Sequence, residues 1–494
     1  MEEVELKFDI ARGDVKRFLR SPELRHAPSR TEELLSIYFD TPDEALAAHG
    51  MTLRLRRAGD RWEQALKGGG SASGGLHARG EWEFESDGSL DLARFASTPL
   101  GRLPHAGALH ERLGELFRVE LQRTTWQLAP VAGVRMEVAL DEGIVRHGGR
   151  EDAVLEVEIE NKEGPPSAIF DVAGRLLSRV ALHASAATKA ARGYRLLHAW
   201  KPQPVRAADI ELDASCHAWA AAAAVLGAGL DQLQANAEGV RLSEDPEFVH
   251  QLRVALRRVR SCLRIFRSVL GRALELEVRS ALKSATAVAG RARDLDVLEL
   301  ETLPAMRAAG APGFGKAFEA RLAAARREAR AGLRAELASR RHARAMLALT
   351  RALHRRAEDG AGGRPAKRFA AKRLRKAHRD VLRDSDRLGQ LDAAGRHALR
   401  IRAKRLRYAL DGVASLFDAK AARRYVQALS KVQDCLGEAN DAVVAQALLR
   451  ELRAPVRLAA FARGWLAARA DAAFAGTASA LEPLRTRAPP WEED

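Results

Sequence analysis

Hydrophobic and polar residues alternate one by one along several short segments in the first 200 residues of the chain. The pattern is clear in VELKF from Val4, MTLRLRR from Met51 and RGEWEFE from Arg79, and it returns in RWEQALK, LQRTTWQL, VRMEVAL and AVLEVEIE. A period of two is typical of strands, because successive side chains point to opposite faces of a sheet. The turn signals GGGSASGG and DEG separate some of these segments. We therefore expect an antiparallel sheet of seven or more strands.

The rest of the chain has a different pattern. Residues 13–20 and 166–178 are predicted helices within the strand-rich part, so we expect an α+β domain over residues 1–200. Two prolines follow at Pro202 and Pro204, where they disfavour both helix and strand ladder, and they predict a linker over 201–208. Beyond the linker the chain is rich in Ala, Leu and Arg with apolar residues three and four positions apart. This spacing predicts an all-α domain over 209–485.

The helical part contains an internal repeat at a spacing of 147 residues. HQLRVALRRVRSCL from His250 returns as HALRIRAKRLRYAL from His397, and thirteen of the 48 aligned positions up to Val297 and Val444 are identical. In repeat proteins each copy is one supersecondary unit that buries its apolar face against its neighbour. We therefore expect two four-helix units, at about 209–358 and 366–485, separated by a Gly/Pro loop at 360–365.

Charge divides along the same boundary. The net charge of +16 consists of −4 in residues 1–200 (27 Lys and Arg, 31 Asp and Glu) and +20 in residues 201–494 (54 and 34). A strongly basic domain attracts polyanions such as nucleic acid, an anionic membrane or a phosphate polymer. The three cysteines are few and far apart, which indicates a reducing compartment without disulfides. Because no apolar stretch has the length of a signal peptide or a membrane span, we expect a soluble cytoplasmic protein with no membrane partner.

Polar residues gather on one face of the predicted strands. In the first strand Glu3, Glu5 and Lys7 share one face and the other face is apolar. For a single strand, a solvated sheet surface is the simpler explanation. The pattern recurs in the pairs Arg54/Arg56, Arg79/Glu81 and Glu156/Glu158. Such a sheet, covered by helices on its apolar face, can close into a barrel with a polar interior. Carboxylates two residues apart suit Mg²⁺ or Mn²⁺, and Arg and Lys opposite them suit phosphate oxygens.

A set of short motifs follows in order along residues 1–200. It comprises E-x-E-x-K with Glu3, Glu5 and Lys7, YFDTPD at 38–43, LRLR with Arg54 and Arg56, ALKG with Lys67, LQRTTW with Arg123, ALDEG with Asp141, EVE with Glu156 and Glu158, and TKAARGYRLL with Lys189. Each motif alone is weak. Together and in this order they resemble the CYTH domain, also called the triphosphate tunnel metalloenzymes.

This resemblance implies an eight-stranded antiparallel tunnel with flanking helices, which binds a triphosphate inside and hydrolyses it, or in a cyclase branch makes cyclic AMP. It implies Mg²⁺ or Mn²⁺ as the cofactor, held by Glu3, Glu5, Asp141, Glu156 and Glu158. It implies triphosphate contacts from Lys7, Arg54, Arg56, Lys67, Arg123 and Lys189. The catalytic residues would be Glu3, Glu5, Lys7 and Asp141, with Asp141 helping to position a metal or the attacking water.

Some neighbours of these motifs have no implied role. We interpret GGGSASGG after Lys67 as a flexible hairpin loop rather than a phosphate cradle, because it lacks the Lys-Ser/Thr that ends a P-loop. Glu160 and the row of Arg79, Glu81 and Glu83 are candidates for ion pairs in the tunnel wall.

Each helical repeat carries a stripe of basic residues opposite an apolar helix face. The stripes comprise His250, Arg253, Arg257, Arg260 and Arg264 in the first repeat, and His397, Arg400, Lys404 and Arg407 in the second. A single stripe of this kind is usually the solvated face of a helix. Because the stripe returns at the same offsets in both copies with few acids between, it favours an anion-binding face.

The doubled H-x-x-R-x-x-x-R/K-R-x-R helix, with RDLDV at 293–297 and LGEAND at 436–441, resembles the CHAD family over 209–485. This resemblance implies two four-helix units around a basic groove or pore that binds inorganic polyphosphate. We interpret Asp294 and Asp441 as partners of the stripe arginines or as helix caps rather than metal ligands. Polyphosphate fits electrostatically because it releases counterions on meeting many cations. Nucleic acid is disfavoured, because the stripes lack aromatic side chains for base stacking and no groove-reading motif is present.

The sequence thus predicts hydrolysis of inorganic triphosphate to diphosphate and phosphate in the tunnel, with the helical domain recruiting the enzyme to polyphosphate or to granules of it. Two alternatives stay open. One is a non-catalytic polyphosphate-binding protein whose tunnel grips a chain end, and the other is an adenylate cyclase or organic triphosphatase. The oligomeric state and any communication between the domains are left undetermined.

Overall fold

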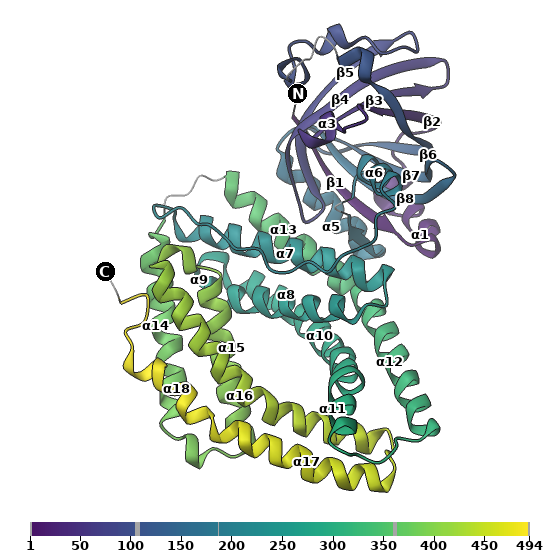
Figure 1. Ribbon diagram of the computed structural model, residues 1–494. Coiled ribbons are helices and arrows are strands. Elements are labelled where there is room, and N and C mark those ends of the chain that lie inside the picture. Colours follow the sequence, from purple (N-terminus) through teal and green to yellow (C-terminus); the bar gives the residue numbers. More distant parts are fainter. Residues whose placement is uncertain (1, 104–108, 186, 359–362, 493–494) are drawn as a thin grey trace. The chain divides into compact units, whose positions relative to one another are not determined.

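The computed structural model of the protein describes residues 2–103, 109–185, 187–358 and 363–492. It consists of two compact units, Met1–Pro202 with Ala338–His354, and Gln203–Leu337 with Arg355–Asp494. The first unit is built on a β-barrel and the second is helical (Figure 1). The predicted α+β class is confirmed.

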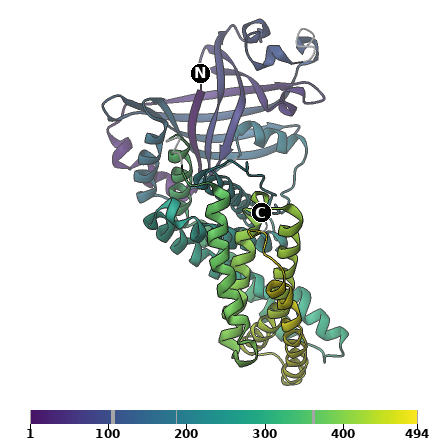
Figure 2. The ribbon, with the colours of Figure 1, turned by 90° about the vertical axis from the view of Figure 1, so that its left-hand side faces the viewer.

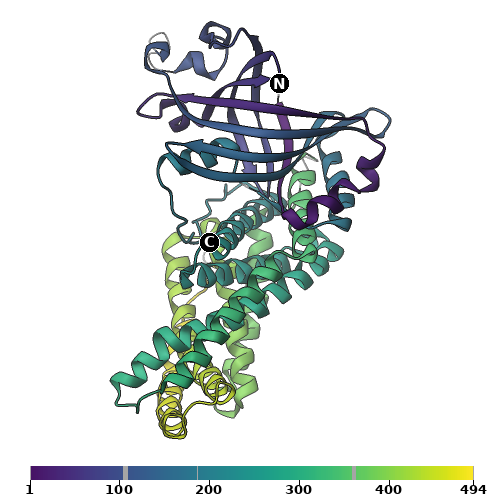
Figure 3. The ribbon, with the colours of Figure 1, turned by 90° about the vertical axis from the view of Figure 1, so that its right-hand side faces the viewer.

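Eight antiparallel strands form the barrel of the first unit. They are β1 (Glu2–Ile10), β2 (Ser29–Asp40), β3 (Met51–Ala58), β4 (Arg61–Ser73), β5 (Leu76–Ser86), β6 (Gly114–Val131), β7 (Val134–His147) and β8 (Arg150–Glu163). The sheet runs in the order β5-β4-β3-β2-β6-β7-β8-β1, and the pairing of β1 with β5 closes it (Figure 2). The short β9 (Leu182–Ala184) pairs with β1 at Phe8–Ile10, beyond the residues of β1 that pair with β5. Figure 3 shows the strands of the barrel from a further side. The predicted eight-stranded tunnel is confirmed.

The Gly-rich segment after Lys67 lies in a hairpin, as expected, but most of it is strand, so our expectation of a flexible loop was wrong for all but Gly74 and Gly75, which form the turn. β4 continues through it to Ser73 with a register shift between Gly68 and Gly70. A Cβ at Gly70 would lie 2.1 Å from the carbonyl oxygen of Ala78, so glycine allows the pairing to continue past the bulge. Gly is used in turns and in bulges alike, and composition alone does not separate the two.

The hydrophobic core of the first unit lies outside the barrel wall. On β1, Val4, Leu6 and Phe8 are buried in a cluster with α5 (Ile169–Arg179) and α1 (Val15–Leu19). Among the described residues, the remaining α-helices of this unit are α2 (Pro22–Arg25), α3 (Ala45–Ala48), α4 (Leu109–Arg112), α6 (Lys189–Leu197) and most of α13 (Arg340–Glu358). Because side chains alternate along a strand, an apolar outer face leaves the intervening polar positions to face the lumen.

The helices of the second unit follow the sequence repeat. They are α7 (Ala218–Leu242), α8 (Pro246–Ile265), α9 (Arg267–Leu270), α10 (Arg272–Val297), α11 (Leu303–Ala308) and α12 (Lys316–Leu337), then α14 (Ala366–Ser385), α15 (Ala393–Asp411), α16 (Ala419–Glu451), α17 (Val456–Ala475) and α18 (Thr477–Thr486). α8 and α15 begin 147 residues apart (393 − 246), and so do α10 and α16 (419 − 272). The repeat in the sequence is therefore a repeat of helices.

The segments that join the repeats and the units are partly anchored. The backbone N–H of Val205, in the predicted linker, donates to Oδ1 of Asn236 at 3.1 Å, and the Asn236 amide donates back to the Val205 carbonyl at 2.8 Å. The predicted loop at 360–365 lies partly outside the described residues. None of the helices in the described part of the chain combines the length and the apolar composition needed to span a bilayer.

Candidate functional site

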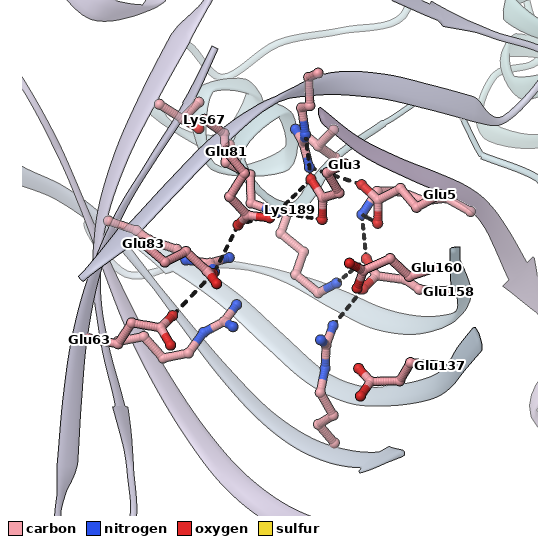
Figure 4. Close-up of a pocket in the computed structure, with 18 of the residues that line it drawn as sticks. Glu3, Glu5, Glu63, Lys67, Glu81, Glu83, Glu137, Glu158, Glu160 and Lys189 are labelled. Carbon is pink, nitrogen blue, oxygen red and sulfur yellow. Dashed lines mark hydrogen bonds and ion pairs between the residues drawn. The ribbon is translucent and has the colours of Figure 1, made fainter. Parts of the chain in front are cut away.

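Charged side chains from the inner faces of the strands line a cavity with about 850 Å³ of open space, part of it continuous with solvent (Figure 4). The cationic lining residues are Lys7, Arg54, Arg56, Lys67, Arg79, Arg123, Lys162 and Lys189. The acidic lining residues are Glu3, Glu5, Glu63, Glu81, Glu83, Glu137, Glu158 and Glu160. Eight cations and eight carboxylates give the lining a formal charge of zero, so an incoming anion would have to exchange ion pairs that already exist.

Lys189 lies among three carboxylates. Its Nζ is 2.7 Å from Oδ2 of Asp141 and 2.8 Å from Oε1 of Glu158, and it also contacts Glu156. Burial alone would lower the pKa of Lys189, but these three carboxylates raise it, so the side chain stays charged. Lys189 is the first residue of α6, whose N-cap Thr188 accepts a hydrogen bond from the Ala191 N–H at 3.1 Å. The start of the helix thus aims the ammonium group at β7 and β8.

Arg123 on β6 holds two of the same carboxylates. Its Nε and Nη2 donate to the two oxygens of Asp141 at 2.7 and 2.6 Å, and Nη2 also donates to Oε2 of Glu158 at 2.5 Å. Asp141 is fully buried and does not line the cavity. Burial would raise the pKa of Asp141, but Arg123 and Lys189 lower it. In this geometry Asp141 orients two cations that do reach the lumen.

Glu158 has three cationic partners. Lys7 and Lys189 both contact its Oε1, and Arg123 contacts its Oε2. Burial would raise the pKa of Glu158, but these three cations lower it well below its usual range. Lys7 also lies 3.2 Å from Glu5 on the same strand face. Lys7, Arg123 and Lys189 therefore converge on one carboxylate.

The opposite part of the lumen is formed by β1, β3, β4 and β5. Lys67 Nζ lies 2.7 Å from both Glu3 and Glu81. The row that had no implied role supplies wall ion pairs, because Arg79 contacts Glu3 at 3.2 Å and Glu5 at 3.0 Å. In the same row Glu81 and Glu83 lie 3.4 and 2.9 Å from Arg54.

Several lining residues were not predicted from the sequence. Glu63, Glu137 and Lys162 line the cavity together with Tyr38 and Thr52. A signal for two of them was present, since Glu137 precedes Asp141 by four residues and Lys162 follows Glu158 by four, so each shares a strand face with a predicted site residue. The motifs of the family did not include Glu63, Glu137 or Lys162, whereas Tyr38 lies in the YFDTPD motif without an implied role.

Arg56 differs from the other predicted phosphate contacts. Among the described residues it forms no ion pair, and its Nε donates a 3.1 Å hydrogen bond to Oγ of Ser36. Burial, Arg54 and Arg123 lower the pKa of Arg56 to about 10. A partly buried cation without an ion-pair partner is unfavourable in the folded protein, and a bound anion would relieve this cost.

A group of three carboxylates has the donor chemistry of a hard cation site. One oxygen from each of Asp141, Glu156 and Glu158 lies within 4.8 Å of the others. Oε2 of Glu156 is buried without a hydrogen-bond partner, and burial raises the pKa of this side chain. Oxygen donors suit Mg²⁺ and Mn²⁺, so the set fits such an ion. Glu3 and Glu5 lie outside this group and pair instead with Lys67, Arg79 and Lys7.

The packing of α6 places Lys189 and leads to a stability prediction. A Cβ at Gly193 would lie 2.2 Å from ring carbons of Phe117, so Gly193→Ala is expected to destabilise the first unit by about 1–3 kcal/mol through overpacking. Gly174→Ala on α5 is the matched control, because a Cβ there has nothing within 4 Å and is expected to add up to about 1 kcal/mol of stability. Urea denaturation of both variants checks the pair, and equal stabilities would contradict the predicted close packing.

The second unit brings the two basic stripes close together. Burial lowers the pKa of Lys404 to about 7, with contributions from Arg400 on its own helix and from Arg257 on α8. Nη1 of Arg253 donates to Asp294 at 3.1 Å and to the Gly290 carbonyl at 3.2 Å. The equivalent Arg400 lies 3.6 Å from Asp441. Asp294 and Asp441 are confirmed as partners of stripe arginines.

The stripes contain donors that the described residues leave without an acceptor. Nε of Arg253, Arg260, Arg400 and Arg407 is buried and makes no hydrogen bond. These four form two equivalent pairs at the repeat spacing, 253 with 400 and 260 with 407. His397 lies 2.9 Å from Oδ1 of Asn440, whereas Arg257, Arg264 and Lys404 form no ion pair with any described residue. The unpartnered Nε donors therefore recur at equivalent positions of the two repeats.

Both units match known families. Residues 1–194 match the family model of the CYTH domain, and residues 224–450 match that of the CHAD domain. An inorganic triphosphatase from Haemophilus influenzae is 32% identical over 162 residues, which cover 32% of this chain and 44% of that protein. The chain thus spans less than half the length of this curated relative. The crystal structure of the CHAD domain from the plant Ricinus communis is 33% identical with a TM-score of 0.50, and the match covers 58% of this chain and 98% of that one.

Proposed function

Because residues 1–194 of the chain belong to the CYTH domain family and residues 224–450 to the CHAD domain family, we propose that the protein hydrolyses inorganic triphosphate in its tunnel and binds inorganic polyphosphate with its helical unit. The observation that carries the first half is the convergence of Lys7, Arg123 and Lys189 on Glu158 inside a closed barrel. The similarity to an inorganic triphosphatase supports it.

The residues of the tunnel can bind and orient the substrate. Arg54, Arg56 and Lys67 on one wall and Lys7, Arg123 and Lys189 on the other line the same cavity, so a short phosphate chain can receive charge-assisted hydrogen bonds along its length. Phosphoryl transfer depends mainly on positioning and on stabilising negative charge, because the transferring group needs little covalent help. Each cation is held in place by a carboxylate or, for Arg56, by Ser36, and therefore needs little reorganisation.

Asp141, Glu156 and Glu158 would hold Mg²⁺ or Mn²⁺, with Glu3 and Glu5 as the further ligands that the family resemblance implies. A bound ion would neutralise phosphate oxygens and polarise the phosphorus toward water. The side chains of the protein supply the remaining contributions, which are binding and orientation of the substrate. Asp141 fixes Arg123 and Lys189, and these cations line the cavity where the phosphate chain would lie.

In the helical unit, the orphan donors of the two stripes support polyphosphate as the ligand. A phosphate polymer offers acceptors to the guanidinium groups of both stripes and releases counterions as it binds. We propose that this surface recruits the protein to long-chain polyphosphate or its granules.

The enzymatic proposal is tested by phosphate release with Mg²⁺ or Mn²⁺. The double variant Glu3→Gln/Glu5→Gln is expected to lose at least about 100-fold of the wild-type rate, because it removes two carboxylates that hold Lys67, Arg79 and Lys7. The exposed Glu33→Gln serves as the control for general effects of charge loss. Equal rates in the double variant and the wild type would contradict the enzymatic proposal. They would favour a tunnel that binds the end of a phosphate chain without hydrolysing it. Faster turnover of ATP or thiamine triphosphate than of inorganic triphosphate would instead favour a nucleotide or organic substrate.

A further inference from the structure

The barrel unit includes a helix that is encoded far along the chain. Residues Ala338–His354, most of α13 (Arg340–Glu358), belong to the same compact unit as Met1–Pro202. In the sequence this helix lies between the two sets of repeated helices. It follows α12 after only two residues, and the first helix of the second repeat, α14, begins at Ala366.

Apolar side chains of α13 complete the core outside the barrel wall. Ala343 and Leu347 are 4% and 7% exposed and lie in one cluster with Leu177 of α5 and Leu182 of β9. The ring of His354 lies 5.6 Å from that of Phe170 on α5. Buried area of this kind is the main source of packing free energy, so the barrel core is incomplete without α13.

Polar contacts at both ends of this helical segment add to the packing. Nη1 of Arg340 donates to the Ser178 carbonyl in the last turn of α5 at 3.0 Å, and Arg351 pairs with Asp171 in its first turn at 2.7 Å. Oγ1 of Thr350 is 3.4 Å from the carbonyl oxygen of Gly74, in the turn between β4 and β5. α13 therefore contacts α5 along its length and reaches the turn that ends the β4–β5 hairpin.

This turn is hydrogen-bonded directly to the strand that carries the site. The Lys7 N–H donates to the carbonyl of Gly75 at 2.9 Å, and the Lys7 carbonyl accepts from the N–H of Ser185 at 2.9 Å. A Cβ at Gly75 would lie 2.9 Å from the Lys7 carbonyl oxygen, so the two backbones pack closely. Ser185 is followed three residues later by Thr188, the N-cap of α6, and then by Lys189.

We propose that α13 is a positioning element of the tunnel, whose packing on α5, β9 and the β4–β5 turn fixes the backbone of Lys7 and the start of α6, and with them the two ammonium groups that converge on Glu158. The helix touches no substrate itself. The geometry of the tunnel therefore depends on a segment that lies, in the sequence, between the first and the second set of repeated helices.

The proposal is tested in the full-length chain with substitutions at Leu347. Leu347→Ala is expected to speed hydrogen exchange of β1 and of the β4–β5 turn, and to weaken the binding of inorganic triphosphate by on the order of tenfold in calorimetry without metal, because the binding cations are misplaced. Leu347→Met keeps the apolar volume and is expected to restore both properties. Wild-type exchange and affinity in Leu347→Ala would overturn the proposal.

Leu458→Ala on α17 is the matched control for a general loss of stability, because Leu458 is also fully buried but lies in the second unit. Its triphosphate affinity is expected to equal that of the wild type, and an equal loss in both variants would contradict a specific role of α13. If Leu347→Ala fails to fold, Thr350→Val removes only a hydroxyl group. Faster exchange of the β4–β5 turn in this variant supports the proposal, and unchanged exchange overturns it.

The binding and kinetic consequences of this inference rest on the proposed function, whereas the hydrogen-exchange consequence does not. If α13 positions catalytic groups, Leu347→Ala raises KM for triphosphate and lowers kcat as well. A wild-type protein that releases no phosphate would refute the proposed hydrolysis, whereas the exchange measurements would still decide the role of α13.

Discussion

Arg56→Gln is expected to lower kcat/KM for inorganic triphosphate by about 100-fold, the usual effect of removing one preorganised donor, and to leave the folded protein at least as stable as the wild type. Among the described residues Arg56 has no ion pair, and Arg54 and Arg123 contribute to the lowering of its pKa to about 10. Its charge thus opposes folding in the absence of substrate. A glutamine keeps a donor for Ser36 without that cost.

Arg79→Gln provides the contrast that makes this result interpretable. Arg79 contacts Glu3 at 3.2 Å and Glu5 at 3.0 Å, so its loss leaves two largely buried carboxylates short of a partner and is expected to lower the thermal midpoint. Steady-state kinetics and thermal denaturation at pH 7 measure both variants. A wild-type kcat/KM for Arg56→Gln would remove Arg56 from the substrate site. A larger stability loss at Arg56 than at Arg79 would show that Arg56 has a counter-ion after all.

Polyphosphate binding by the wild type is expected to weaken as pH rises from 7 to 9, and Lys404→Arg is expected to abolish this dependence. The pKa of Lys404 is lowered to about 7 by burial, Arg400 and Arg257. A bound polyanion favours the charged lysine, so binding takes up a proton once Lys404 is neutral, and affinity falls by up to roughly tenfold per pH unit. An arginine stays charged throughout this range.

Four other charged groups act on Lys404. They are Arg400 on α15, Arg253 and Arg257 on α8 and Asp441 on α16. The pKa of His250 is lowered by burial and by Arg293, so this residue titrates below the range from pH 7 to 9. Titration with a polyphosphate of fixed chain length at pH 7, 8 and 9 and constant ionic strength checks the prediction. Lys420→Arg, at an exposed position on α16, should keep the wild-type pH dependence. Identical pH profiles for Lys404→Arg and the wild type would show that Lys404 is not the group that takes up the proton.

The lowered pKa of Lys404 also affects the stability of the protein without bound polyphosphate. The folded-state pKa of Lys404 is below its ordinary value of 10.5, so the unfolded chain binds more protons between about pH 7 and 10.5. The contribution of Lys404 to stability therefore increases with pH across this range, opposite to the change in polyphosphate affinity. Ligand binding and folding make opposite demands on this side chain, as they do on Arg56.

The part of the candidate site that follows from the alternation of side chains along each strand could be predicted from the sequence. Glu3, Glu5 and Lys7 face the lumen because they alternate with buried Val4 and Leu6, and this period is a property of any strand. The repeat spacing likewise located the equivalent arginines at 253 and 400. The Gly-rich segment after Lys67 was interpreted wrongly because the bulge depends on a partner strand that local composition does not reveal.

The sequence by itself therefore determined which residues share a face of a strand or helix, because this follows from chain geometry over a few positions. The two results were a polar inner face on the strands and a basic stripe on two equivalent helices. Only the tertiary structure decided which cation pairs with which carboxylate. It left Arg56 without a counter-ion while giving Arg79 two, and it buried Asp141 behind Arg123 and Lys189. It also assigned most of α13 to the barrel unit. These outcomes depend on contacts between segments far apart in the chain, and such contacts are set by the closure of the barrel and the packing of distant helices, which no local pattern encodes.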